Sequence, residues 1–141
     1  MDMETILIIG GILTVMVLVF LGMSMATTRR SARTPLDKQF VGREWQKITA
    51  LAEHSDQSAR YAVIEADKLL DHVLKARGYR GEKMGDRLRE AGPDFSYQDD
   101  VWQAHKLRNK LVHEAEYEVD HRLVTRAVKQ FRRALKDMGA F

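Results

Sequence analysis

The amino-terminal segment constrains the fold most, because the 24 residues from Thr5 to Thr28 carry no charged side chain. Its most apolar part, residues 6–25, would extend about 30 Å as an α-helix, which matches the hydrocarbon core of a bilayer. A helix of this length in a globular protein would show a polar face, and this segment shows little beyond Thr14. We therefore predict one transmembrane helix over residues 6–25, within an anchor of residues 1–28.

The charges that flank this segment predict its orientation. Asp2 and Glu4 precede it, whereas Arg29, Arg30 and Arg33 follow it in a basic juxtamembrane linker of residues 29–35. Because cytoplasmic flanks are enriched in Lys and Arg, we expect the amino terminus outside and the carboxyl-terminal domain on the cytoplasmic side of the inner (plasma) membrane. A cleavable signal peptide is the alternative, but its first residues should be basic and here they are acidic.

The residues after the linker are sufficient for one domain with one core. Beyond residue 34 the chain has 20 Lys and Arg against 18 Asp and Glu, so its net charge makes no case for nucleic acid. Cysteine is absent, which excludes disulfides, thiolate metal sites and a cysteine nucleophile. We predict no cofactor.

Apolar residues recur at helical spacing through residues 36–54, 56–77, 97–114 and 120–138, and a shorter piece covers residues 81–91. Gly78 and the pair Gly92-Pro93 are stop signals between these segments. No segment alternates with the period of two that is typical of a strand. We therefore predict an all-α domain over residues 36–141, a four-helix bundle with one extra short helix.

The segment 97–114 carries the polar side chains that suggest chemistry. Arg108 falls within the apolar arc of this helix, so it needs a carboxylate partner, and we predict Asp67 or Asp71. A stripe of His105, Asn109 and His113 runs beside it at four-residue spacing. His105 and His113 lie about 12 Å apart along the helix, too far to share one metal ion, and we predict no metal site.

The run from Ala104 to Glu114 resembles the signature of the HEPN superfamily, an R-x4-H motif in which Asn follows Arg. HEPN domains are small helical bundles with this motif in a late helix, and catalytic members pair so that two motifs form a cleft that cuts RNA without metal. The resemblance implies an active-site set of Arg108, Asn109 and His113, supported by His105, and a homodimer. Residues 65–71, the turn at 78–81 and His113-Glu114 also resemble a group of uncharacterised membrane-anchored bacterial proteins.

Two hypotheses for function follow. In the first, the domain is an RNA- or nucleotide-directed module that acts as a metal-independent endoribonuclease: His113 takes a proton from a ribose 2′-hydroxyl while Arg108 stabilises the attacked phosphate. In the second, it is a non-catalytic membrane scaffold that binds a cytoplasmic protein partner, and the motif residues hold the helices together.

A basic stripe along the last predicted helix is compatible with either hypothesis. Such a stripe binds phosphates of RNA or of anionic lipid, or it is a solvated helix face. Its residues are Arg122, Arg126, Lys129, Arg133 and Lys136.

Overall fold

The computed structural model describes residues 9–20, 33–114, 117–118 and 120–141, in two separate units, Met1–Ser31 and Ala32–Phe141. In the first unit, residues 9–20 form a helix whose apolar side chains are exposed. Within the described residues, no helix has the length and apolar character required to cross a membrane.

This finding corrects the prediction for the amino-terminal segment. The prediction of a single-pass anchor over residues 6–25, and with it the inner-membrane localisation and orientation, is wrong, because the described residues contain no helix that is long and apolar enough to span a membrane. The remainder of the predicted span, residues 6–8 and 21–25, lies outside the described residues, as do Arg29 and Arg30 of the predicted linker.

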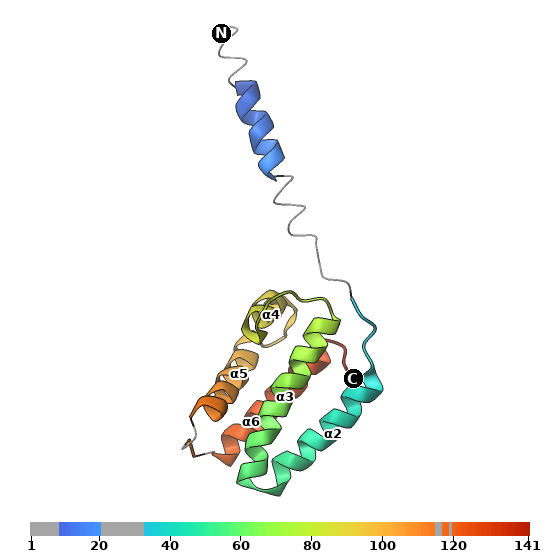
Figure 1. Ribbon diagram of the computed structural model, residues 1–141, viewed down its shortest axis with the longest axis vertical. Coiled ribbons are helices and arrows are strands. Elements are labelled where there is room, and N and C mark those ends of the chain that lie inside the picture. Colours follow the sequence, from blue (N-terminus) through green and yellow to red (C-terminus); the bar gives the residue numbers. More distant parts are fainter. Residues whose placement is uncertain (1–8, 21–32, 115–116, 119) are drawn as a thin grey trace. The chain divides into compact units, whose positions relative to one another are not determined.

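The second unit is helical throughout its described elements, which confirms the predicted all-α bundle (Figure 1). No strand occurs in residues 33–114, 117–118 or 120–141. Four long helices and one short helix lie close to the predicted ranges. A 3-10 turn, η1, lies between the short helix α4 and the long helix α5. Their bounds are α2 Lys38–His54, α3 Asp56–Ala76, α4 Met84–Ala91, η1 Gly92–Asp94, α5 Gln98–His113 and α6 His121–Asp137.

Side-chain caps explain where three of these helices begin. The carboxylate of Asp37 accepts a hydrogen bond from the Phe40 amide at 2.9 Å, and the Ser55 hydroxyl accepts one from Ser58 at 3.2 Å. Asp120 does the same for the Arg122 amide at 2.8 Å. Each cap satisfies one of the amides that the first helical turn leaves without a backbone partner.

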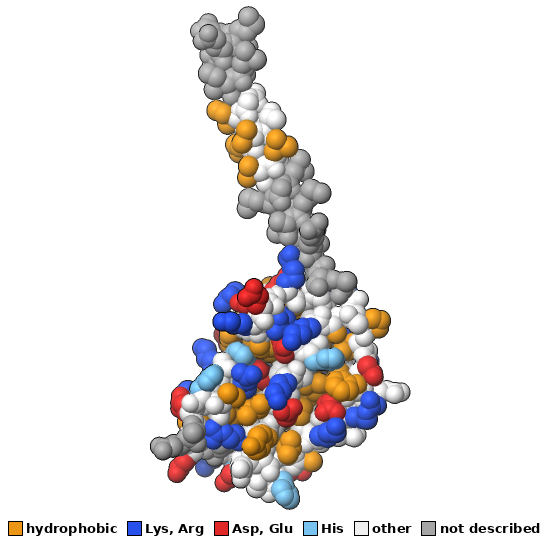
Figure 2. Space-filling view, viewed as in Figure 1, with side chains coloured by type: hydrophobic (Ala, Val, Ile, Leu, Met, Phe, Trp, Pro, Cys, Tyr) orange, Lys and Arg blue, Asp and Glu red, His pale blue; other side chains and the backbone are white. Residues whose placement is uncertain are grey.

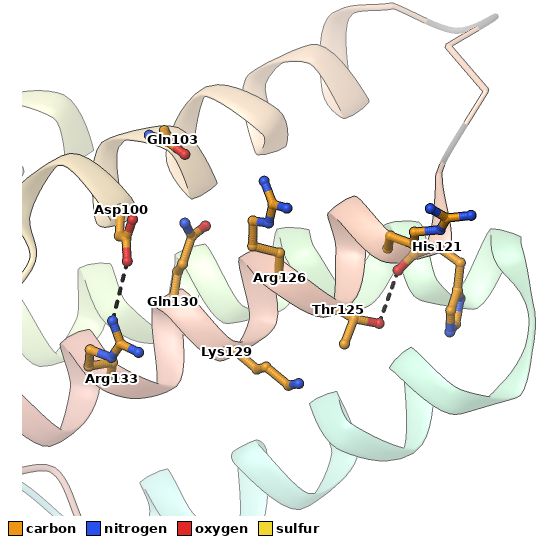
Figure 3. A pocket seen from close by; sticks show the side chains of 9 residues that line it. Asp100, Gln103, His121, Thr125, Arg126, Lys129, Gln130 and Arg133 are labelled. Carbon is orange, nitrogen blue, oxygen red and sulfur yellow. Dashed lines mark hydrogen bonds and ion pairs between the residues drawn. The ribbon is translucent and has the colours of Figure 1, made fainter.

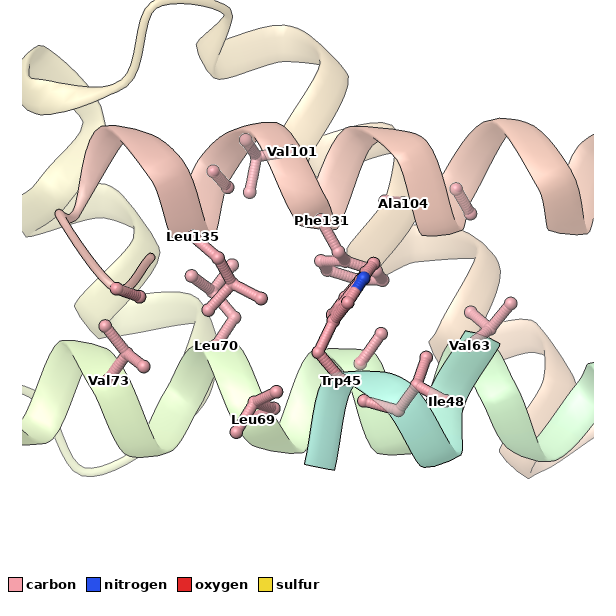
Figure 4. Close-up of a cluster of buried hydrophobic side chains, with 14 of the residues drawn as sticks. Trp45, Ile48, Val63, Leu69, Leu70, Val73, Val101, Ala104, Phe131 and Leu135 are labelled. Atoms are coloured by element: carbon pink, nitrogen blue, oxygen red, sulfur yellow. The ribbon is translucent and has the colours of Figure 1, made fainter. Parts of the chain in front are cut away.

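Helix α3 is the centre of the bundle and packs against α2, α4, α5 and α6. The side chains between these helices form one core, which Figure 4 shows in part, and the largest fully buried member is Phe131 of α6. The core takes residues from each of the four long helices: Trp45 and Ile48 from α2, Val63, Leu69, Leu70 and Val73 from α3, Val101 and Ala104 from α5, and Phe131 and Leu135 from α6. Polar residues on α3 and α5 are therefore held in place by packing on both sides.

Candidate functional site

Asp67 is the buried acidic residue at the contact between α3 and α5. It is 1% exposed, and its two carboxylate oxygens face two side chains of α5. Oδ1 lies 2.7 Å from Nδ1 of His105, and Oδ2 lies 3.2 Å from Nε of Arg108. The structure therefore brings one of the two predicted acidic partners, Asp67, to Arg108, and it adds His105 to the same carboxylate.

Asn109 closes these contacts into a cycle of four side chains, Asp67, His105, Asn109 and Arg108, here called the Asp67 cycle. Nη1 of Arg108 donates to Oδ1 of Asn109 at 2.9 Å, and Nδ2 of Asn109 lies 3.3 Å from Nε2 of His105. Because Arg108 can only donate, the amide oxygen of Asn109 faces Arg108 and its NH₂ group faces His105. The network thus assigns the proton of the neutral imidazole to Nδ1, where it is donated to Asp67.

Arg108 is the least satisfied member of the Asp67 cycle. Its Nε is buried and within ion-pair distance of Asp67, yet it lacks a hydrogen bond of good alignment among the described residues. Its side chain is 26% exposed, in contrast to 2% for Asp67. The carboxylate therefore holds the guanidinium from inside the bundle and leaves part of it accessible to an anion in solvent.

His113 is the last residue of α5 and is exposed. Within the described residues no side-chain hydrogen bond or ion pair holds its imidazole. Successive residues of a helix turn by about 100°, so His113 points about 140° away from Arg108 around the axis of α5. Within a single copy of the protein, Arg108, Asn109 and His105 therefore lie together, and His113 lies apart from them.

Arg60 of α3 fixes the end of α5 that carries His113, and sequence reasoning missed it. Its Nε donates to the Leu111 carbonyl at 2.9 Å, and its Nη2 donates to the carbonyls of Leu111 and, at 2.9 Å, of Glu114. Both carbonyls lie at the end of α5, and the Glu114 carbonyl also accepts the Tyr117 amide at 3.2 Å. The contact joins residues 51 and 54 positions apart, so periodicity within α3 could not reveal it.

Asp71, the second predicted partner of Arg108, belongs to a different cluster. Its Oδ1 lies 2.6 Å from Nε of Arg87, and its Oδ2 lies 2.6 Å from Nζ of Lys75. Nη1 of Arg87 also donates to the Gly81 carbonyl. Burial raises the pKa of Asp71, but hydrogen bonds and charge from Arg87 and Lys75 outweigh that effect and lower the pKa below its usual value.

The predicted basic stripe lies on α6 and lines an open groove of about 630 Å³ against α5 (Figure 3). Four of its five members line the groove, namely Arg122, Arg126, Lys129 and Arg133, and Lys136 does not. Asp100 supplies the single carboxylate of the lining and lies 3.3 Å from Arg133. The face shown in Figure 2 is different, since Lys and Arg side chains there are interspersed with Asp and Glu.

Comparison with known proteins adds no relative: no protein-family model, curated protein or solved structure matches this chain. Among the residues that the structure describes, no group of three or more His, Cys, Asp or Glu side chains is arranged to hold a metal ion.

Proposed function

We propose that the domain is an RNA-directed, HEPN-like module that cleaves RNA without metal through Arg108, Asn109 and His113. The observation that carries the proposal is the Asp67 cycle. A buried carboxylate and an amide fix an arginine whose outer part stays accessible, on the helix that also presents an exposed histidine. Preorganised cations of this kind stabilise charge that develops on a phosphate during reaction.

The proposed reaction is an internal transfer at phosphorus. His113 takes the proton of a ribose 2′-hydroxyl, the 2′-oxygen bonds to phosphorus, and the bond from phosphorus to the 5′-oxygen breaks. The leaving oxygen takes a proton from water, and the products are a 2′,3′-cyclic phosphate and a 5′-hydroxyl. Arg108 stabilises the added negative charge on the phosphate oxygens, and Asn109 holds the Arg108 guanidinium at 2.9 Å.

A homodimer is part of the proposal. Because Arg108 and His113 point about 140° apart on α5, a single helix does not aim both at one phosphate. A second copy that packs along α5 would set its own His113 opposite the first Arg108. In a two-fold arrangement each copy would supply the same residues to the other.

The test is incubation of the full-length chain with mixed RNA in chelator, with the products analysed for cyclic phosphate ends. Arg108→Ala and His113→Ala should each abolish cleavage, and His54→Ala, which removes an exposed histidine at the end of α2, should not. Circular dichroism confirms that each variant is folded. Absence of cleavage by the wild type at concentrations where it is dimeric would reject the nuclease proposal.

A second candidate function is a non-catalytic protein-interaction domain in which the motif residues serve structure. The observation that favours it is the burial of Asp67 and His105, which shows that half of the Asp67 cycle joins α3 to α5 inside the bundle. Under this candidate, Arg108→Ala should lower the melting temperature and His113→Ala should leave it unchanged. Neither variant should cleave RNA.

A further inference from the structure

Helix α5 has two different polar flanks, and Arg108 and Asn109 of the R-N-x3-H motif lie on one of them. His105, Arg108 and Asn109 face α3, whereas Gln103, Lys106, Leu107 and Lys110 face α6. The flank toward α6 lines a second hollow of about 280 Å³, to which Leu123 and Tyr117 also contribute. This hollow shares Gln103, Arg126 and Gln130 with the groove of about 630 Å³, so the two adjoin along α5 and α6, and together they are here called the α5–α6 groove.

The charge of the α5–α6 groove is almost entirely positive. Its lining holds six Lys and Arg side chains and one carboxylate, Asp100, which is already paired with Arg133. The cations are Lys106, Lys110, Arg122, Arg126, Lys129 and Arg133. Among the described residues, the side chains of Lys106, Arg122, Arg126 and Lys129 have no ion-pair partner. The chain as a whole is near neutral, at a formal charge of +3, so this concentration of unpaired cations is local.

The spacing of the cations on α6 suits a linear polyanion. Arg122, Arg126, Lys129 and Arg133 follow one another at intervals of three or four residues and therefore form one stripe, about 16 Å long. A linear stripe can contact several successive phosphates of one strand, whereas a compact nucleotide would engage one part of it. In Figure 3 the Arg126 side chain extends from α6 toward α5, and Arg126 lines both hollows.

Aromatic rings stand at both ends of this stripe. Tyr97, directly before α5, is 57% exposed, and the Arg133 guanidinium lies over one face of its ring at 4.3 Å. Tyr117 lines the second hollow, where its ring packs partly buried against the core and Lys110 lies 5.8 Å from the ring centre. Unpaired bases stack on such rings, but bases inside a duplex present only their edges. Rings at the ends of a basic groove therefore favour a single strand over a duplex.

We propose that the α5–α6 groove binds single-stranded RNA, with phosphates along Arg122, Arg126, Lys129 and Arg133 and bases stacked on Tyr97 and Tyr117. This inference rests on the RNA-directed function proposed above and names the surface that holds the strand beside the motif helix. It assigns substrate binding to one flank of α5 and cleavage to the other flank and the tip.

The experiment measures fluorescence anisotropy of a labelled 12-nucleotide oligouridylate with the full-length chain carrying His113→Ala, which prevents turnover during the titration. Arg126→Glu, which reverses a charge shared by both hollows, should weaken binding about tenfold or more. Arg43→Glu on α2 makes the same change in net charge at an exposed position and should change the Kd by about twofold or less. Equal weakening by both variants would overturn the groove as the site.

Two further titrations test the single-strand assignment. Tyr97→Ala should weaken binding of the single strand about tenfold, and a blunt RNA duplex should bind more weakly than the single strand. A duplex that binds equally well or better would overturn the assignment. So would a polyglutamate peptide that binds the groove while the oligouridylate does not, since that result would indicate an acidic protein partner.

Cleavage and binding separate the two proposals. If the chain cleaves RNA but Arg126→Glu leaves its affinity for RNA unchanged, the proposal that the groove binds RNA is wrong and the nuclease proposal stands. If Arg126→Glu weakens RNA binding as expected but the chain with His113 intact releases no cyclic phosphate, the proposed RNA-binding groove stands and the nuclease proposal is wrong.

Discussion

Asp67 and Asp71 lie one turn apart on α3, and the difference between their surroundings separates a candidate working site from a structural contact. Asp71 receives two cations, Arg87 and Lys75, at 2.6 Å each, and the Arg87 side chain is only 7% exposed. Asp67 receives one arginine at 3.2 Å and one histidine at 2.7 Å, and the arginine is 26% exposed. Both aspartates join helices through an arginine, but only the arginine of the Asp67 cycle is accessible, and the exposed cation on Asp71 is Lys75 of the same helix.

Burial of a carboxylate does not decide its role. Asp67 is the more buried of the two, yet its arginine remains open to solvent, whereas the partly buried Asp71 pairs with an arginine of α4 that is itself buried between α4 and α3. A cation that is held from inside and open outside can bind an external anion. A cation that is surrounded by protein groups cannot.

The largest expected effect is the loss of stability caused by Asp67→Ala. The substitution leaves Arg108 without its carboxylate and His105 without the acceptor for its Nδ1 proton, so we expect a loss of about 3 kcal/mol in the free energy of unfolding. Urea unfolding followed by circular dichroism measures it. A loss below about 1 kcal/mol would mean that water replaces the carboxylate and that the cycle does not join α3 to α5.

A smaller loss is expected for Arg87→Ala. The substitution leaves Asp71 with Lys75 alone, which is mostly exposed, so the free energy of unfolding should fall by about 2 kcal/mol. The matched substitution Arg89→Ala removes an exposed arginine from the same short helix and should cost about 0.5 kcal/mol or less. RNA cleavage at saturating RNA should be unchanged by both, and a selective loss in Arg87→Ala would break the proposed division between the two aspartates.

The tip of α5 should respond to Arg60→Ala by about 1 kcal/mol, because three donated hydrogen bonds to the last carbonyls are lost. Amide hydrogen exchange should accelerate around residues 110–114 and stay unchanged around the Asp67 cycle. Arg77→Ala serves as control, since Arg77 binds the Met138 and Gly139 carbonyls beyond α6 in the same way. Uniform acceleration along α5 would show that Arg60 supports the whole helix rather than its end.

The smallest effect is the acid dependence of Asp71. Because its pKa is lower in the folded than in the unfolded chain, its ion pairs contribute stability above the unfolded pKa, about 4, and that contribution is lost as the pH falls through the folded pKa. Melting temperatures between pH 2 and 6 should therefore fall more for the wild type than for Asp71→Asn. Parallel curves for the two proteins would contradict the lowered pKa.

Helical periodicity predicted the bundle well, because the core side chains of α2, α3, α5 and α6 repeat at three- and four-residue spacing. It also placed Asp67 on the flank of α3 that faces α5. Asp71 was assigned to the wrong arginine, since the sequence does not show that α4 returns to α3 and delivers the buried Arg87. Arg60 and the α5–α6 groove depend on helix packing, which no local pattern reports.

The amino-terminal prediction failed for a related reason. Hydropathy reports which residues could enter a bilayer, whereas spanning also requires one helix that is both long and apolar, and no such helix occurs among the described residues. Composition there favoured a structure that the described residues do not form.

The most direct test of the contrast between the two aspartates is RNA cleavage in chelator by Asp67→Asn and Asp71→Asn, at a temperature where both full-length variants are folded. Each substitution removes one negative charge from the same face of α3 and keeps the side-chain shape. We expect Asp67→Asn to lose cleavage as Arg108→Ala does, because the Arg108 guanidinium is no longer held in its orientation. We expect Asp71→Asn to cleave RNA at the wild-type rate. Equal activity in the two variants, or equal loss, would contradict the assignment of the Asp67 cycle to function.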